Sequence, residues 1–154
     1  PGIAQALDRL DVPFCVASSS QPERIRLSLE LTGLIDYFAP NIFSATMVEN
    51  GKPAPDLFLH AAKTMGAVPA RCLVIEDSPA GIAAAKAADM RVFGFLGGSH
   101  AEPAGLRAAL EALEPDLIFD DMQTLPDLIG SGAGAFSAKA DTTFAVRKRD
   151  KTKG

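Results

Sequence analysis

The sequence has little of what a secreted, disulfide-stabilised or membrane protein needs. Tryptophan is absent, and there are only two cysteines among 154 residues. Cys15 and Cys72 lie in separate apolar stretches, outside any Cys-x-x-Cys pair or Cys/His cluster, so neither a disulfide framework nor a zinc site is expected. No apolar run reaches about 18 residues, which argues against a transmembrane helix, and no signal-peptide pattern opens the chain. These absences predict a cytoplasmic protein whose cysteines are small core residues in a reducing compartment.

Positive charge is also scarce over most of the chain. The formal net charge is −4, yet residues 130–154 carry six basic and two acidic residues, so residues 1–129 are strongly acidic. An acidic body does not suit a polyanion, and we expect neither a nucleic-acid nor a membrane partner. The basic cluster at 147–153 could be a nucleic-acid patch, but it follows a Gly-, Ala- and Ser-rich stretch. We therefore interpret 130–154 as a flexible basic tail and 1–129 as one domain.

Apolar residues recur alternately at helical spacing and in short strand-forming runs. Helices are predicted over residues 2–10, 22–33, 55–65, 79–89, 103–113 and 121–129, and strands over 12–17, 41–45, 71–75, 91–95 and 116–119. The strands lack polar alternation, which indicates burial on both faces. The pattern predicts an α/β domain of three layers, with a parallel sheet between helices. In such sheets ligands bind at the carboxyl ends of the strands.

Three polar segments follow predicted strands. Ser18 and Ser19 combine hydroxyls with backbone amides at a helix start, which can bind phosphate. Lys52, in GKPAPD, offers a point charge for a phosphoryl oxygen, and the adjacent carboxylates of Glu76 and Asp77 suit Mg²⁺. Each segment also has a purely structural explanation: a serine cap, a surface lysine, and acids at a helix start. Together, at the tips of one sheet, they predict a site for phosphate and Mg²⁺.

The segments VASSS, GKPAPDLFLHAA and CLVIEDSPAGIAAAKAADM resemble the second, third and fourth signatures of the haloacid-dehalogenase-like hydrolases. The most similar branch holds β-phosphoglucomutase and sugar-phosphate phosphatases, and the resemblance extends over about residues 1–129. It implies a Rossmann-like core and Mg²⁺-dependent phosphoryl transfer through an aspartyl-phosphate. The implied substrate is a small phosphorylated metabolite, with a sugar phosphate as the expected class.

The resemblance also implies roles for individual residues. Ser18 corresponds to the hydroxyl that hydrogen-bonds the transferring phosphoryl group, and Ser19 helps to orient that group through its amide. Lys52 corresponds to the lysine that neutralises phosphoryl charge and links to the nucleophile. Asp77 corresponds to the direct Mg²⁺ ligand, with Glu76 as its partner through a metal-bound water.

One family signature is missing. The first signature is an Asp-x-Asp pair on a central N-terminal strand, which supplies the nucleophile and the general acid/base. No two aspartates of this chain are separated by one residue, and the helical cap domain that selects the substrate is also absent. Loss of that strand would leave backbone groups unpaired at about 1–3 kcal/mol each.

We therefore expect one of three situations: a preceding N-terminal part outside this sequence, a complementing segment supplied by another chain, or a rearranged sheet. In each case the chain alone is expected to be inactive. The alternative function is a non-catalytic fragment that binds phosphate and Mg²⁺ or a partner. Dehalogenation is disfavoured, because such enzymes need no Mg²⁺. A receiver-type signalling domain would place its acidic pair after the first strand, where this chain has serines.

Overall fold

The structure is a computed structural model that describes residues 2–97, 103–130 and 144–146. The helices are α1 (Ile3–Asp8), α2 (Pro22–Leu31), α3 (Ile35–Phe38), α4 (Asp56–Met65), α5 (Pro79–Ala87), α6 (Pro103–Glu111) and α7 (Leu125–Gly130). The strands are β1 (Phe14–Ser18), β2 (Ile42–Ser44), β3 (Leu73–Glu76), β4 (Arg91–Phe95), β5 (Leu117–Phe119) and β6 (Phe144–Val146). Short 3₁₀ turns cover Ala45–Met47, Pro69–Arg71 and Met122–Thr124.

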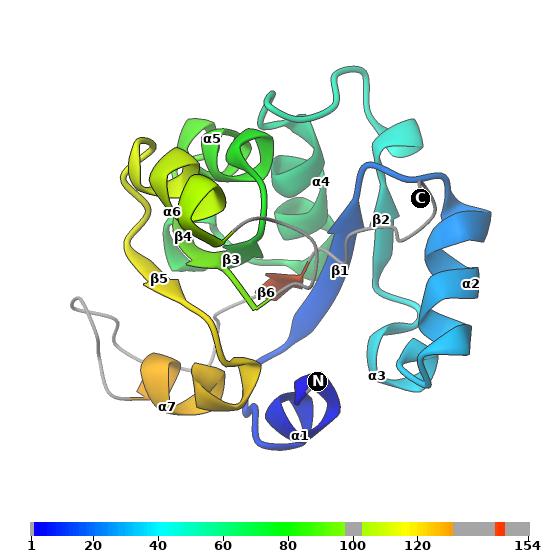
Figure 1. Ribbon diagram of the computed structural model, residues 1–154. Coiled ribbons are helices and arrows are strands. Elements are labelled where there is room, and N and C mark those ends of the chain that lie inside the picture. Colours follow the sequence, from blue (N-terminus) through cyan, green and yellow to red (C-terminus); the bar gives the residue numbers. More distant parts are fainter. Residues whose placement is uncertain (1, 98–102, 131–143, 147–154) are drawn as a thin grey trace.

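The strands form one sheet in the order β2-β1-β6-β3-β4-β5, and every neighbouring pair is parallel. Helices cover both faces (Figure 1). On one face α1, α2, α3 and α7 pack on apolar side chains that include Val16 and Ile75. On the other face α4, α5 and α6 pack on side chains that include Cys15, Ala17 and Val74. The three-layer, Rossmann-like fold expected from the alternating pattern is confirmed.

The local signals at the helix ends act as expected. Ser78 caps α5, because its Oγ accepts a hydrogen bond of 3.2 Å from the Gly81 amide, and Pro79 follows at the first helical position. Gly66 ends α4 in the left-handed region, at φ 72°. No helix in the described part of the chain is long and apolar enough to span a membrane.

Helix α3 was not predicted from the sequence. Its four residues are too few to show helical periodicity, so only tertiary packing reveals it. Phe38 is 2% exposed, and its ring meets that of Phe14 edge-on at 5.4 Å between centroids.

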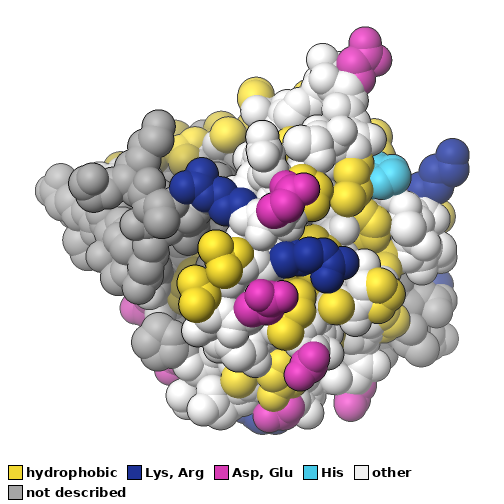
Figure 2. Space-filling view, turned by 90° about the vertical axis from the view of Figure 1, so that its right-hand side faces the viewer, with side chains coloured by type: hydrophobic (Ala, Val, Ile, Leu, Met, Phe, Trp, Pro, Cys, Tyr) yellow, Lys and Arg dark blue, Asp and Glu magenta, His cyan; other side chains and the backbone are white. Residues whose placement is uncertain are grey.

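Figure 2 shows the α2 side of the molecule, where hydrophobic side chains lie between charged side chains of both signs. Two of the exposed hydrophobic residues, Leu27 and Leu31, belong to α2.

The main difference from expectation is β6. This strand lies between β1 and β3, with Phe144 level with Phe14 and Leu73, and Val146 level with Val16 and Ile75. Residues of this chain therefore fill the central position of the sheet in this structure, as the rearranged-sheet expectation requires, while a preceding part or a complementing segment stays a prediction. Residues 144–146 belong to the sheet rather than to the tail predicted over 130–154, and Gly130 belongs to α7. The remainder of that predicted tail lies outside the described residues.

Candidate active site

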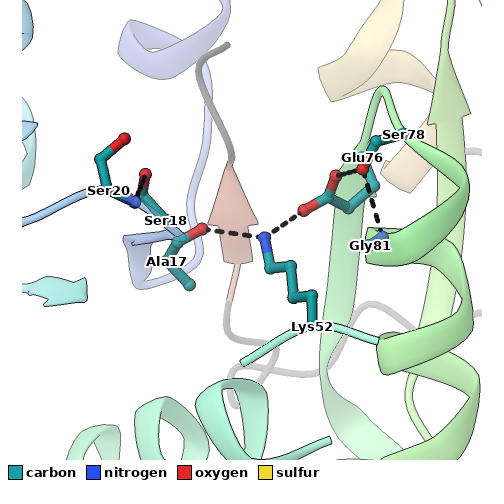
Figure 3. Close-up of polar contacts among 7 residues, drawn as sticks. All are labelled: Ala17, Ser18, Ser20, Lys52, Glu76, Ser78 and Gly81. Atoms are coloured by element: carbon teal, nitrogen blue, oxygen red, sulfur yellow. Dashed lines mark hydrogen bonds and ion pairs between the residues drawn. The ribbon is translucent and has the colours of Figure 1, made fainter. Parts of the chain in front are cut away.

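A buried ion pair lies at the carboxyl ends of β1 and β3. The ammonium Nζ of Lys52 is 2.5 Å from Oε1 of Glu76, and the two side chains are 2% and 0% exposed. The same Nζ donates a 3.3 Å hydrogen bond to the carbonyl of Ala17 on β1, so Lys52 connects the ends of the two strands (Figure 3). It also lies 4.8 Å from the ring centroid of Phe58, within cation–π range.

The start of α5 fixes the carboxylate of Glu76. Ser78 Oγ donates to Glu76 Oε2 at 3.1 Å, and Ser78 is itself held as the cap of α5. Gly81 lies directly against the carboxyl group, and any Cβ there would collide with the Glu76 carboxyl atoms. A glycine is therefore required at this position, which explains one residue of the EDSPAG segment.

The loop that carries Lys52 is closed by Asp56, the first residue of α4. Both the backbone amide and the side-chain amide of Asn50 donate to Asp56 Oδ2, each at 3.2 Å. The amide of Ala54 donates to the carbonyl of Gly51 at 3.0 Å, forming a turn around the lysine. These contacts bring the base of the lysine side chain to the entrance of α4, from which its ammonium reaches the sheet.

Ser18 lies at the end of β1, but its side chain leaves the sheet on the other face. It is 5% exposed, its Oγ accepts a 3.1 Å hydrogen bond from the Ser20 amide, and it lines a pocket beneath α2 with Val16 and Arg24. Successive strand side chains alternate between faces, so Ala17 is turned toward the α4 and α5 side instead. The loop after β1 is anchored where Ser44 Oγ donates to the Ser20 carbonyl at 2.6 Å.

Asp77 follows directly after β3, and one of its carboxylate oxygens has an unusual environment. Its Oδ1 is buried and has no hydrogen-bond partner among the residues that the structure describes. A buried carboxylate oxygen without a partner is costly, so such an atom is a suitable ligand for a cation. In residues 2–97, 103–130 and 144–146, no group of three or more His, Cys, Asp or Glu side chains could hold a metal ion. Asp77 could therefore contribute one oxygen, and other ligands would have to come from elsewhere.

The structure thus brings Lys52 and Glu76 together, with the backbone of β1 as the third partner. Ser18 and the exposed Ser19 lie at the adjacent strand end, with the Ser18 hydroxyl on the α2 side. Sequence reasoning did not identify the carbonyl of Ala17 or the ring of Phe58. Neither has a sequence signal, because a backbone carbonyl exists at every residue and Phe58 fits the apolar pattern of a helix.

Cys15 and Cys72 are buried thiols, which agrees with the prediction that both are core residues. Burial of Cys15, together with the neighbouring Cys72, raises the pKa of the Cys15 thiol from 9.0 to about 12. A thiol of such high pKa holds its proton at neutral pH and is a poor nucleophile. Cys15 is therefore a core residue and not a candidate for covalent chemistry.

Comparison with known proteins identifies the family. The family model for haloacid dehalogenase-like hydrolases matches residues 1–89, more than half of the chain. The chain therefore belongs to the haloacid dehalogenase-like hydrolases. The matched residues include both partners of the buried ion pair, Lys52 and Glu76.

The relatives include phosphatases and phosphomutases. The 6-phosphogluconate phosphatase of Escherichia coli is 31% identical over 102 residues, which are 66% of this chain and 46% of that protein. A haloacid dehalogenase-like protein from Agrobacterium tumefaciens superposes with a TM-score of 0.81 at 42% identity, covering 86% of this chain and 60% of the other. A β-phosphoglucomutase from Clostridium difficile superposes with a TM-score of 0.71 at 27% identity, covering 88% and 56%.

The chain spans less than half the length of the first curated relatives that it matches, and about three fifths of the similar solved chains. The family-model match over residues 1–89 contains the segments around Ser18, Lys52 and Glu76. The activities in the names of these relatives are therefore activities of longer proteins.

Proposed function

We propose that this chain is the C-terminal part of the core of a Mg²⁺-dependent phosphoryl-transfer enzyme, a phosphatase or phosphomutase. Its substrate would be a small phosphorylated metabolite, with a sugar phosphate as the favoured class. The observation that carries the proposal is the buried ion pair of Lys52 and Glu76, which fixes the lysine ammonium at the carboxyl edge of a parallel sheet. A fixed ammonium at this edge is suited to neutralise phosphoryl oxygens.

The names of relatives support the class of substrate. The E. coli relative is a 6-phosphogluconate phosphatase, and another is a hexitol phosphatase from the same organism. A 35% identical hydrolase from Deinococcus radiodurans was solved with bound phosphate and sodium, and it superposes with a TM-score of 0.77. Phosphate esters of small polyols are therefore the first compounds to test.

In the proposed reaction, each site residue has a separate task. Ser18 and Ser19 would bind phosphoryl oxygens through hydroxyl and amide groups, and Lys52 would neutralise their charge. The Ser18 hydroxyl, which here accepts from the Ser20 amide on the α2 side, would have to turn toward the phosphoryl group. Glu76 orients Lys52, because one of its carboxylate oxygens binds the ammonium and the other accepts from Ser78. The water-mediated metal contact implied for Glu76 by the resemblance remains part of the proposal.

The donor atoms partly fit a Mg²⁺ ion. Asp77 Oδ1 is a buried acceptor that receives no hydrogen bond from the described part of the chain, and it would be the direct ligand. A protein commonly supplies Mg²⁺ with one or two carboxylates, and phosphate and water complete the shell. When bound, the ion would neutralise charge on the transferring phosphoryl group.

The chain lacks an Asp-x-Asp pair, so we propose that it is inactive by itself and that an N-terminal complementing segment supplies the nucleophile. A phosphatase assay with sugar phosphates and Mg²⁺ should show no turnover by the chain alone. Metal-dependent turnover by the isolated chain at the rate of an intact relative would contradict this expectation. Addition of an N-terminal fragment of such a relative, which carries the missing strand, should restore measurable turnover.

Binding tests the site without turnover. Titration calorimetry with inorganic phosphate and Mg²⁺ should show binding by the chain, weakened at least about tenfold in Asp77→Asn, since a lost charged contact costs about 1.5–3 kcal/mol. Asp36→Asn is the matched control, because Asp36 is exposed on α3. Unchanged binding by Asp77→Asn would remove Asp77 from the site.

A non-catalytic binding fragment is the second candidate function. The observation that favours it is β6, which occupies the centre of the sheet in this chain. Phosphate binding that persists without turnover, even when the N-terminal fragment of a relative is added, would support this function instead.

A further inference from the structure

The centre of the sheet is held by one of its shortest strands. β6 has three residues, whereas its neighbours β1 and β3 have five and four. A central strand must pair its backbone with neighbours on both sides, and β6 does so along three positions with each neighbour. We call the position between β1 and β3 the β1–β3 slot.

The slot continues past the described strand. β6 ends at Val146, level with Val16 and Ile75, while β1 and β3 each continue to the next residue, Ala17 and Glu76. At that next level Lys52 spans the slot, from the carbonyl of Ala17 to the carboxylate of Glu76. The end of the slot and the candidate active site are therefore the same place.

β6 is also separated from the rest of the fold along the chain. Residues 131–143 connect the end of α7 to the start of β6, and eight of these thirteen residues are Gly, Ala or Ser, at 131–135, 137, 138 and 140. The other five strands and all seven described helices lie within residues 3–130. The contacts that define the slot are main-chain pairs, which a strand of another sequence can also make.

We propose that β6 is an exchangeable occupant of the β1–β3 slot, and that a parallel strand from a separate polypeptide segment can replace it. This inference deepens the proposed function and rests on it where the incoming strand is identified with the complementing segment. Binding of that segment and insertion of β6 are mutually exclusive, because two strands cannot pair with β1 and β3 at once. Residues 144–146 then act as an internal competitor of complementation.

The test measures strand exchange directly. The probe is a fluorescent synthetic peptide with the sequence of residues 141–149, and binding is followed by fluorescence anisotropy. The full chain is compared with Ala145→Pro, because proline removes a ladder donor and is not tolerated in a central strand. The peptide should bind Ala145→Pro at least about tenfold more tightly than the unchanged chain, since the tethered strand otherwise competes at an effective concentration in the millimolar range. A peptide with proline in place of Ala145 is the control and should not bind.

Equal affinity of the two chains for the peptide would overturn the proposal, as would absence of binding to a folded Ala145→Pro chain. If circular dichroism shows that Ala145→Pro is unfolded, Ala145→Gly replaces it, with a smaller gain in the same direction, and equal binding by that variant overturns the proposal. Hydrogen exchange should locate the bound peptide at β1 and β3. The readout needs no phosphate, Mg²⁺ or turnover, so its failure is distinct from failure of the proposed function.

Discussion

Removal of the buried lysine charge should strongly destabilise the fold. In Lys52→Met the carboxylate of Glu76 would stay buried with its cation gone. At 2.5 Å and an effective dielectric constant of about 20, the gross attraction of the pair is about 7 kcal/mol, and the desolvation of both charges opposes it. Loss of one partner of a buried pair typically costs about 3–5 kcal/mol. That is a large fraction of a total stability of about 5–15 kcal/mol.

Urea unfolding followed by circular dichroism measures this loss of free energy of unfolding. In thermal unfolding, the melting temperature should fall by about 10 °C. The control is Lys63→Met, because Lys63 is exposed on α4 and its replacement should change stability by less than about 0.5 kcal/mol. The double variant Lys52→Met with Glu76→Gln should recover at least about 1 kcal/mol relative to Lys52→Met, since no unpaired charge remains. A loss below about 1 kcal/mol in Lys52→Met would refute the buried pair.

Three further predictions concern the supports of the site and the core. Gly81→Ala should lower stability by about 1–3 kcal/mol in thermal unfolding, because the new methyl group collides with Glu76. Gly51→Ala should be nearly neutral, because its methyl group would meet Ala45 Cβ at 3.9 Å, an ordinary contact. The pKa of the Cys15 thiol is about 12 in the native state and about 9 in the unfolded state. Between these pH values only the unfolded state loses the proton, so stability should fall as pH rises above about 9, by up to about 1.4 kcal/mol per pH unit. Cys15→Ala should flatten this slope in urea titrations between those two pH values. Ser44→Ala removes a buried hydroxyl that donates at 2.6 Å to the loop after β1, and should cost about 1–2 kcal/mol, while a loss near zero would show that this loop needs no anchor.

The alternating apolar pattern was sufficient for the class of fold. Runs such as residues 71–75 are apolar on both faces, and only a sheet covered on two sides buries them. Serine, glycine and proline marked the helix ends, because capping and backbone conformation are local properties. Helix α3 escaped prediction because four residues show no period, and its position depends on the packing of Phe38.

The candidate site was predictable as a set of residue types but not as a set of contacts. The sequence placed Lys52 and Glu76 after different elements, and the parallel sheet then brought their side chains together. Neither the Ala17 carbonyl that receives the lysine nor the departure of the Ser18 side chain toward α2 has a local signal. Both depend on strand register, which is a property of the assembled sheet.

The sequence by itself determined a parallel α/β domain with its polar groups at the strand ends, because hydrophobic period and capping chemistry act over a few residues. Only the tertiary structure decided what stands between β1 and β3. Pairing of β6 joins Phe144 to Phe14 across 130 positions of the chain, and such pairing depends on which backbone edges remain open once all other strands are in place. No short sequence pattern predicts which strand fills the position between two other strands, since any strand that satisfies their backbone donors and acceptors can fill it.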